Sequence, residues 1–184
     1  ARTALERFIR EDEAAKKDKD LFKQGAAIQR PRVMYHLGWV EATEEKHEAA
    51  AERFAQVPNA HPLGPDAALQ HGIALVNHGN FEVAAKHFPK MLKQFQQHEK
   101  LNLIIYYAGL SSAKQEEWKN AAGHFKNFTA SYPKSENHDQ ALYEWAWAER
   151  GLENDKEAVR LYEELLAKHP KSPLVVKVQS ELAE

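Results

Sequence analysis

The side chains of this sequence that could bind a metal or move a proton are ten histidines and 27 acidic residues. His71 and His78 stand seven residues apart, two turns on one predicted helix, but neither belongs to a His-Glu-x-x-His arrangement or to a carboxylate cluster. A zinc site needs three or four converging ligands at such spacings. We therefore expect no metal site and no cofactor.

The sequence also lacks the patterns that activate a nucleophile. It has no cysteine, no Gly-x-Ser-x-Gly elbow and no glycine-rich loop that could cradle a phosphate. The carboxylate pairs Glu44-Glu45 and Glu163-Glu164 fall on helix faces that we expect to be exposed, where solvated charge is the ordinary explanation. The sequence predicts no catalytic residue, and we expect a protein that is not an enzyme.

A repeated spacing of small and aromatic residues is the strongest feature of the chain. An alanine is followed four residues later by an aromatic residue in four places, Ala50 and Phe54, Ala84 and Phe88, Ala121 and Phe125, and Ala158 and Tyr162. Twelve residues before these alanines stand other small residues, Gly38, Gly72, Gly109 and Ala146. Their spacing is 34, 37 and 37 residues, the period of two-helix repeats.

This register resembles the tetratricopeptide repeat, in which Leu-Gly lies on a first helix and Ala, Phe and Pro lie on and after a second. Leu37-Gly38 is the complete pair, whereas His71-Gly72, Ala108-Gly109 and Trp145-Ala146 depart from it. The resemblance implies an all-α fold, an α-α superhelix or solenoid of about four helix-turn-helix repeats with flanking helices. The four repeats are expected at residues 31–64, 65–98, 102–135 and 139–172.

The small residues have a physical role that does not depend on the resemblance. Small side chains let two helix axes approach at the short end of the range of about 8–10 Å. Larger residues such as Met34, Phe54 and Val57 then fill the flanks of the crossing and the contact with the next repeat. We expect a continuous stack of repeats without an internal linker.

Both ends of the sequence leave alternatives open. Residues 1–30 are either the second helix of a partial repeat, since Ala4 and Phe8 have the right spacing, or a charged capping helix that ends near Gly25. Residues 173–184 are either a capping helix or the first helix of a truncated fifth repeat. No secretory signal is evident, so we expect a mature form or a segment of a larger protein.

The resemblance implies that the first helices line a concave surface, and it places mostly apolar residues there. Tyrosine and tryptophan offer a large contact area at little entropic cost, which suits a groove for a peptide. The alternative is that these rings fill a tightly wound superhelix. The candidate partner-binding residues are Tyr35, Trp39, Ile73, Asn77, Tyr106, Lys114, Tyr143, Trp147 and Arg150.

The ends of two repeats carry a second resemblance. Residues 131–135 (Ser-Tyr-Pro-Lys-Ser) and 168–172 (Lys-His-Pro-Lys-Ser) look like repeats of bacterial envelope proteins, particularly the outer-membrane assembly lipoprotein and the Tol-Pal coordinator. The resemblance implies a periplasmic or envelope-associated location, with a cytoplasmic one as the alternative. The absence of cysteine permits an oxidising compartment without indicating one.

Charge and hydropathy limit the partners. The net charge of −2 lacks the basic excess of proteins that bind nucleic-acid backbones, and no apolar run approaches the ~20 residues of a membrane helix. We therefore expect a non-enzymatic scaffold for a protein or peptide partner, with no nucleic acid and no membrane span. A cytoplasmic adaptor or regulatory module and a homo-oligomerisation domain are the alternatives.

Overall fold

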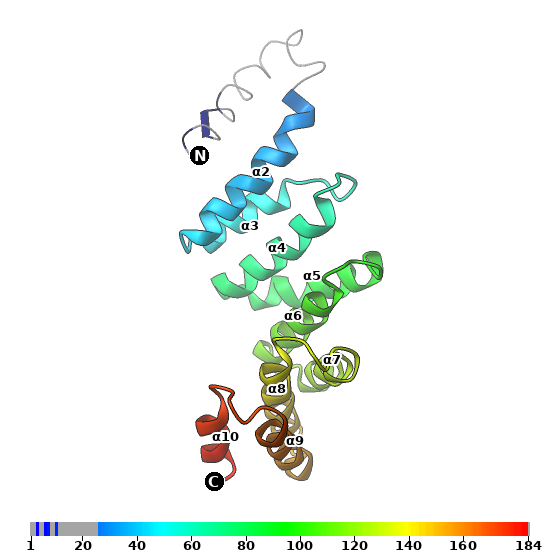
Figure 1. The fold of residues 1–184 in the computed structure, drawn as a ribbon. Coiled ribbons are helices and arrows are strands. Elements are labelled where there is room, and N and C mark those ends of the chain that lie inside the picture. Colours follow the sequence, from blue (N-terminus) through cyan, green and yellow to red (C-terminus); the bar gives the residue numbers. More distant parts are fainter. Residues whose placement is uncertain (1–2, 4–5, 8–9, 11–25, 184) are drawn as a thin grey trace. The chain divides into compact units, whose positions relative to one another are not determined.

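The computed structural model describes residues 3, 6, 7, 10 and 26–183, and every regular element in them is a helix. Figure 1 follows the helices along the chain. The prediction of an all-α helical repeat fold is confirmed. The expectation for residues 1–25 lies outside the described residues, apart from the four isolated ones. The chain forms two units, residues 1–80 and 81–184.

The first unit contains three successive helices that pack pairwise, α3 against α2 and α4 against α3. Helix α2 continues past Pro31, so the first helix begins earlier than the predicted start of the repeat at residue 31. Met34, Leu37 and Phe54 are buried at the contact of α2 with α3. The helices of this unit are α2 (Ala26–Thr43), α3 (His47–Ala55) and α4 (Gly64–His78).

The second unit has the same pairwise packing within itself, because each helix from α6 to α9 packs against the one before it. A short last helix, α10, lies against α9 and buries Val178. The predicted repeat at 65–98 is divided between the two units, and the repeat boundaries stay predictions. The helices are α5 (Phe81–Gln94), α6 (Leu101–Lys114), α7 (Trp118–Ser131), α8 (His138–Gly151), α9 (Asp155–Lys168) and α10 (Val175–Glu181).

Two of the repeated glycines lie directly beneath an aromatic ring. A Cβ atom on Gly38 would lie 2.9 Å from the Phe54 ring, and one on Gly109 would lie 2.9 Å from the Phe125 ring. Carbon atoms in contact prefer about 3.5–4.0 Å, so a methyl group does not fit without movement. The glycine and the aromatic residue sixteen positions later therefore form one packing unit, which explains why their spacing recurs.

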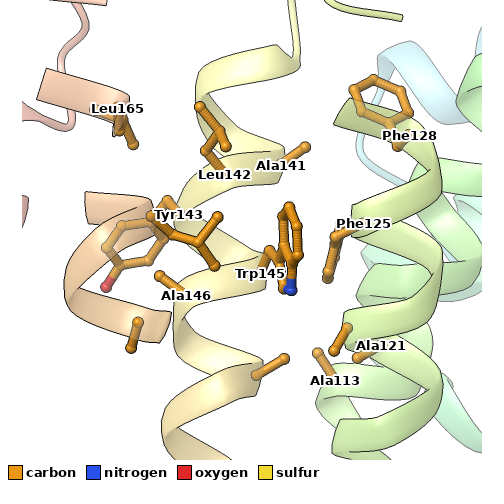
Figure 2. Close-up of a cluster of buried hydrophobic side chains, with 14 of the residues drawn as sticks. Ala113, Ala121, Phe125, Phe128, Ala141, Leu142, Tyr143, Trp145, Ala146 and Leu165 are labelled. Carbon is orange, nitrogen blue, oxygen red and sulfur yellow. The ribbon is translucent and has the colours of Figure 1, made fainter. Parts of the chain in front are cut away.

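Helix α8 buries side chains on two sides. In Figure 2, Trp145 points toward Phe125 on α7, whereas Tyr143 lies on the side of α9. The cluster around it has fully buried members on all three helices, including Phe128, Leu142 and Leu165. A helix covered on both sides positions its remaining residues firmly, and these include Trp147 and Arg150.

The turns inside the helix pairs share a backbone feature that the sequence does not reveal. Glu45, Glu116 and Glu153 have φ of 59°, 58° and 62°, and Gly79 has φ of 86°. Each stands seven residues after the small residue of its first helix. The left-handed conformation favours glycine, yet three of the four positions carry glutamate. The turn geometry is thus set by the packing of the helices, against the local preference of the residue.

Among the described residues, no helix is both long and apolar enough to cross a membrane.

Candidate functional site

In the first unit, Tyr35 and Trp39 lie one turn apart on α2 and form an aromatic cluster. Their ring centroids are 6.4 Å apart at 76°, and both rings contact Phe54 edge-on, at 5.9 and 6.0 Å. The Tyr35 hydroxyl donates a short hydrogen bond to Asp66 on α4. Tyr35 is thereby fixed between the two helices, while Trp39 keeps 38% of its surface exposed.

The two predicted contacts on α4 differ in accessibility. Ile73 is half-buried and Asn77 is exposed near the end of the helix. Of the predicted residues in the first unit, Trp39 and Asn77 are therefore the ones that present an accessible side chain to a partner.

In the second unit, the structure buries Tyr106 on α6. The side chain is 8% exposed, and its ring contacts Phe125 at 6.0 Å and Phe128 at 5.7 Å. This burial raises the pKa of Tyr106 well above its usual value, so the hydroxyl stays protonated. Tyr106 acts mainly in packing, and little of it is accessible to a partner.

Tyr143 and Trp147 on α8 are stacked, with ring centroids 6.5 Å apart and planes at 17°. Tyr143 is 4% exposed because α10 covers it: the Lys177 ammonium lies 4.4 Å from its ring centroid, and its hydroxyl donates to Glu181 over 3.2 Å. Burial, followed by the Glu181 carboxylate, raises the pKa of Tyr143. Arg150 forms a short ion pair with the same carboxylate.

Trp147 remains accessible beside this covered tyrosine. It is 41% exposed, and the Arg150 guanidinium lies 5.3 Å from its ring centroid. Trp147 lines a depression of about 240 Å³ together with residues of α6, α8 and α10. We call this the Trp147 depression, and its lining residues are Ala113, Lys114, Tyr143, Glu144, Trp147, Lys177 and Glu181.

The charges around the Trp147 depression are unequally satisfied. Glu181 is held by Arg150 and Tyr143, and Glu144 accepts a hydrogen bond from Gln140 over 2.9 Å. Lys114 is exposed at the end of α6 and forms no ion pair among the described residues. Lys177 likewise has no ion pair among the described residues, but its ammonium group lies over the Tyr143 ring. The depression thus offers an accessible indole and the ammonium group of Lys114 free of any such contact.

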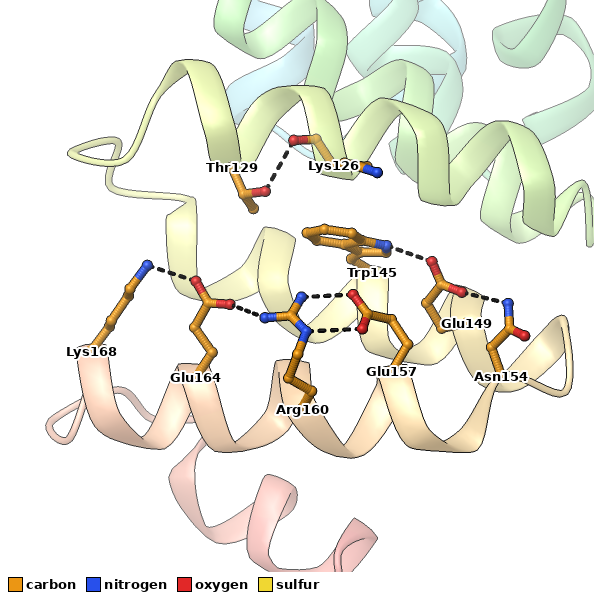
Figure 3. Close-up of polar contacts among 9 residues, drawn as sticks. All are labelled: Lys126, Thr129, Trp145, Glu149, Asn154, Glu157, Arg160, Glu164 and Lys168. Atoms are coloured by element: carbon orange, nitrogen blue, oxygen red, sulfur yellow. Dashed lines mark hydrogen bonds and ion pairs between the residues drawn. The ribbon is translucent and has the colours of Figure 1, made fainter.

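The carboxylates on α9 form a surface network with no feature of a reactive site. Arg160 binds Glu157 and Glu164, and Lys168 binds Glu164, all at helical spacing (Figure 3). The hydrogen bond from Arg160 lowers the pKa of Glu157. Among the described residues, no three histidine or carboxylate side chains converge on a potential metal position.

Lys177 and Glu181 of α10 were not among the predicted site residues, although a helix was expected at residues 173–184. They stand 37 residues after Gln140 and Glu144, the spacing of a further repeat. The buried Val178 likewise follows the buried Ala141 by one step. The 37-residue spacing can be read from the sequence, whereas the ion pair between Glu181 and Arg150 is seen only in the structure.

Comparison with known families matches residues 104–135 and 140–172 to the tetratricopeptide repeat. The chain contains tetratricopeptide repeats. The matched segments are the helix pairs α6 with α7 and α8 with α9, which carry the Trp147 depression apart from the residues of α10. The predicted resemblance to this family is confirmed, whereas the resemblance to envelope proteins stays a prediction. No curated protein matches the sequence.

Solved tetratricopeptide structures share the fold at low sequence identity. YrrB, described as a TPR protein with an unusual peptide-binding site, is 18% identical with a TM-score of 0.73, and the match covers 97% of this chain and 84% of YrrB. MamA from Desulfovibrio magneticus RS-1 is 20% identical with a TM-score of 0.68, over 78% of this chain and 77% of MamA. Another MamA structure is 15% identical with a TM-score of 0.67, and the match covers 77% of this chain and 74% of MamA.

Proposed function

We propose that this protein is a non-enzymatic protein-interaction module that binds a partner polypeptide through the concave sides of its tetratricopeptide repeats. The observation that carries the proposal is the exposure of Trp39 and Trp147. A tryptophan left 38% or 41% exposed on a rigid helix, beside a second aromatic ring, has the properties of an interface anchor. Both stand at first-helix positions that the register assigns to the inner surface.

The size of the Trp147 depression favours a peptide side chain over a small molecule. Its volume of about 240 Å³ is below the ~300–1,000 Å³ that is typical of small-molecule pockets. An apolar side chain of a partner stacked on Trp147, with a carboxylate or carbonyl oxygen near Lys114, would use the exposed indole and the ammonium group of Lys114. The peptide-binding site named for YrrB supports this kind of function for the fold.

The proposed setting is a bacterial envelope assembly, with the periplasm as the compartment. Its support is the five-residue motif that ends two repeats, at residues 131–135 and 168–172, which resembles repeats of bacterial envelope proteins. A cytoplasmic adaptor built on the same repeats is the alternative. Fractionation of cells that express the full gene, with the chain followed by immunoblot, distinguishes the two.

The test of the binding proposal compares alanine substitutions of equally exposed residues. Trp147→Ala should weaken binding to the partner captured by the wild-type chain about 30-fold, which corresponds to about 2 kcal/mol, the scale of an interface hot spot. Val159→Ala on α9, where the valine is 43% exposed, is the matched control and should leave affinity unchanged. Equal affinity of both variants and the wild type would show that the partner binds another surface.

A further inference from the structure

Two histidines form a partly buried contact between the start of α8 and the end of α9. Nδ1 of His138 and Nε2 of His169 are 2.8 Å apart, within hydrogen-bonding distance. His138 is the first residue of α8 and is 2% exposed, and His169 caps the end of α9. At this distance one nitrogen must donate and the other must accept, so at least one ring must be neutral at the contact.

The neighbouring repeat shows that the fold does not require histidines here. The residues 37 positions earlier are Leu101 and Tyr132, and both pack against the hydrophobic cluster. The loops that follow α7 and α9 have the same backbone hydrogen bonds: Ser135 N–H donates to the Tyr132 carbonyl over 3.0 Å, and Ser172 N–H donates to the His169 carbonyl over 2.9 Å. Two imidazoles thus occupy positions that a leucine and a tyrosine fill in the repeat before.

Within the described part of the chain, the last loop is joined to α8 by two polar side-chain contacts, and the histidine contact is one of them. The Ser172 hydroxyl donates a short hydrogen bond to Asp139, the residue after His138. This loop leads directly into α10, which has only seven residues and buries Val178 alone. A helix of that length is not stable without its contacts. The loop therefore acts together with the contacts that Lys177 and Glu181 make with α8, and each contributes to the docking of α10.

We propose that the His138–His169 contact is a proton-sensitive latch, which holds residues 169–174 and α10 on α8 near neutral pH and releases them when both imidazoles are protonated. One added proton can be accommodated by exchange of donor and acceptor roles. A second proton places an N–H on both facing nitrogens, and the contact is lost.

The surrounding charges do not compensate for a second proton. Lys168 on α9 opposes protonation of His138, and the Glu164 carboxylate that would favour it is already bound to Arg160 and Lys168. On α7 the Thr129 backbone favours the protonated form, and on α8 Asp139 is engaged by Ser172. Burial is the largest effect, and it lowers the pKa of His138 below the ordinary 6.5.

The sign of the pH dependence follows from proton counts. The released state can bind a proton on each ring below about pH 6.5, whereas the docked state holds at most one. Acid therefore favours release, and the docking equilibrium constant should fall about tenfold for each pH unit below about 6.5. Lys177 and Glu181 on α10 line the Trp147 depression, so release would also change that surface.

The test is amide hydrogen exchange of the full chain at pH 7.5 and 5.0, corrected for intrinsic rates. The protection of Val175–Glu181, measured relative to α7, should fall about 30-fold in the wild type, since pH 5.0 is about 1.5 units below 6.5. The double variant His138→Leu with His169→Tyr copies the residues of the preceding repeat, and its relative protection should not change with pH. His169→Gln keeps a hydrogen-bonding side chain and removes one of the two titrating rings, so its drop should be smaller than that of the wild type, with the remainder due to the buried His138.

Asp139→Asn is the control for the second contact, and it should weaken α10 docking while keeping the drop between the two pH values. The latch is refuted if wild-type protection is equal at both pH values, or if both histidine variants retain the wild-type drop. A double variant that fails to fold leaves the decision to His169→Gln. The measurement uses no partner, so its outcome is independent of the proposed function.

Discussion

Replacing Glu116 with glycine should stabilise the protein, although it removes a whole side chain. Glu116 has φ of 58°, and its side chain forms no hydrogen bond or ion pair within the described part of the chain. An L-residue pays roughly 1–2 kcal/mol in the left-handed region, whereas glycine pays about 0.5–1 kcal/mol of additional backbone entropy. The difference predicts a net gain of about 0.5–1 kcal/mol for Glu116→Gly.

Urea unfolding followed by circular dichroism measures this gain. With a slope of ~2 kcal/mol/M, the midpoint should rise by about 0.3–0.5 M. Glu116→Ala is the control, because it removes the same charge but keeps the Cβ, and it should leave the midpoint unchanged. At the equivalent turn, Gly79→Ala should destabilise by about 1 kcal/mol, since no atom lies within 4 Å of the new Cβ and the strain comes from φ alone. If Glu116→Ala stabilised as much as Glu116→Gly, relief of charge, and not of backbone strain, would be the cause.

Two further substitutions test packing and surface charge. Gly109→Ala should lower stability by about 1–2 kcal/mol, because its Cβ would lie 2.9 Å from the Phe125 ring, whereas Gly123→Ala on α7, with no atom within 4 Å, should raise it by about 0.5–1 kcal/mol in thermal unfolding. Equal effects at the two positions would contradict the close approach. Arg160→Met should make stability less dependent on pH in acid. Arg160 lowers the pKa of Glu157 in the folded state, so the stabilisation by the Glu157 carboxylate is present above the ordinary pKa of 4.5. That stabilisation is lost as the pH falls through the pKa of Glu157 in the folded state. Urea midpoints at pH 7 and pH 3.5 measure this, and an unchanged difference would show that Arg160 is not the cause.

The fold could be predicted from the sequence because its key contacts repeat at a fixed spacing. Gly38 with Phe54 and Gly109 with Phe125 each lie sixteen residues apart within one helix pair, so the pattern of residue types records the contact directly. Periodic local contacts of this kind are what a single sequence reveals best. The detail that was missing is that the ring itself covers the glycine.

The candidate site was harder to predict, because exposure depends on what packs over a residue. Tyr143 and Trp147 are both aromatic residues at first-helix positions, and the sequence assigns them the same role. The structure covers Tyr143 with Lys177 of α10 and leaves Trp147 accessible. Likewise, no sequence rule places glutamate at a left-handed turn, so Glu45 and Glu153 carried no signal of their conformation.

The position of the partner on the surface is the most direct test of the account. The chain has no cysteine, so Lys114→Cys and Glu163→Cys each provide one thiol for a photoactivatable cross-linker, the first in the Trp147 depression and the second on the exposed face of α9. We expect the partner to be cross-linked from position 114 and not from position 163, and Trp147→Ala in the Lys114→Cys chain to reduce the yield. Cross-linking from position 163 alone would contradict binding through the concave side.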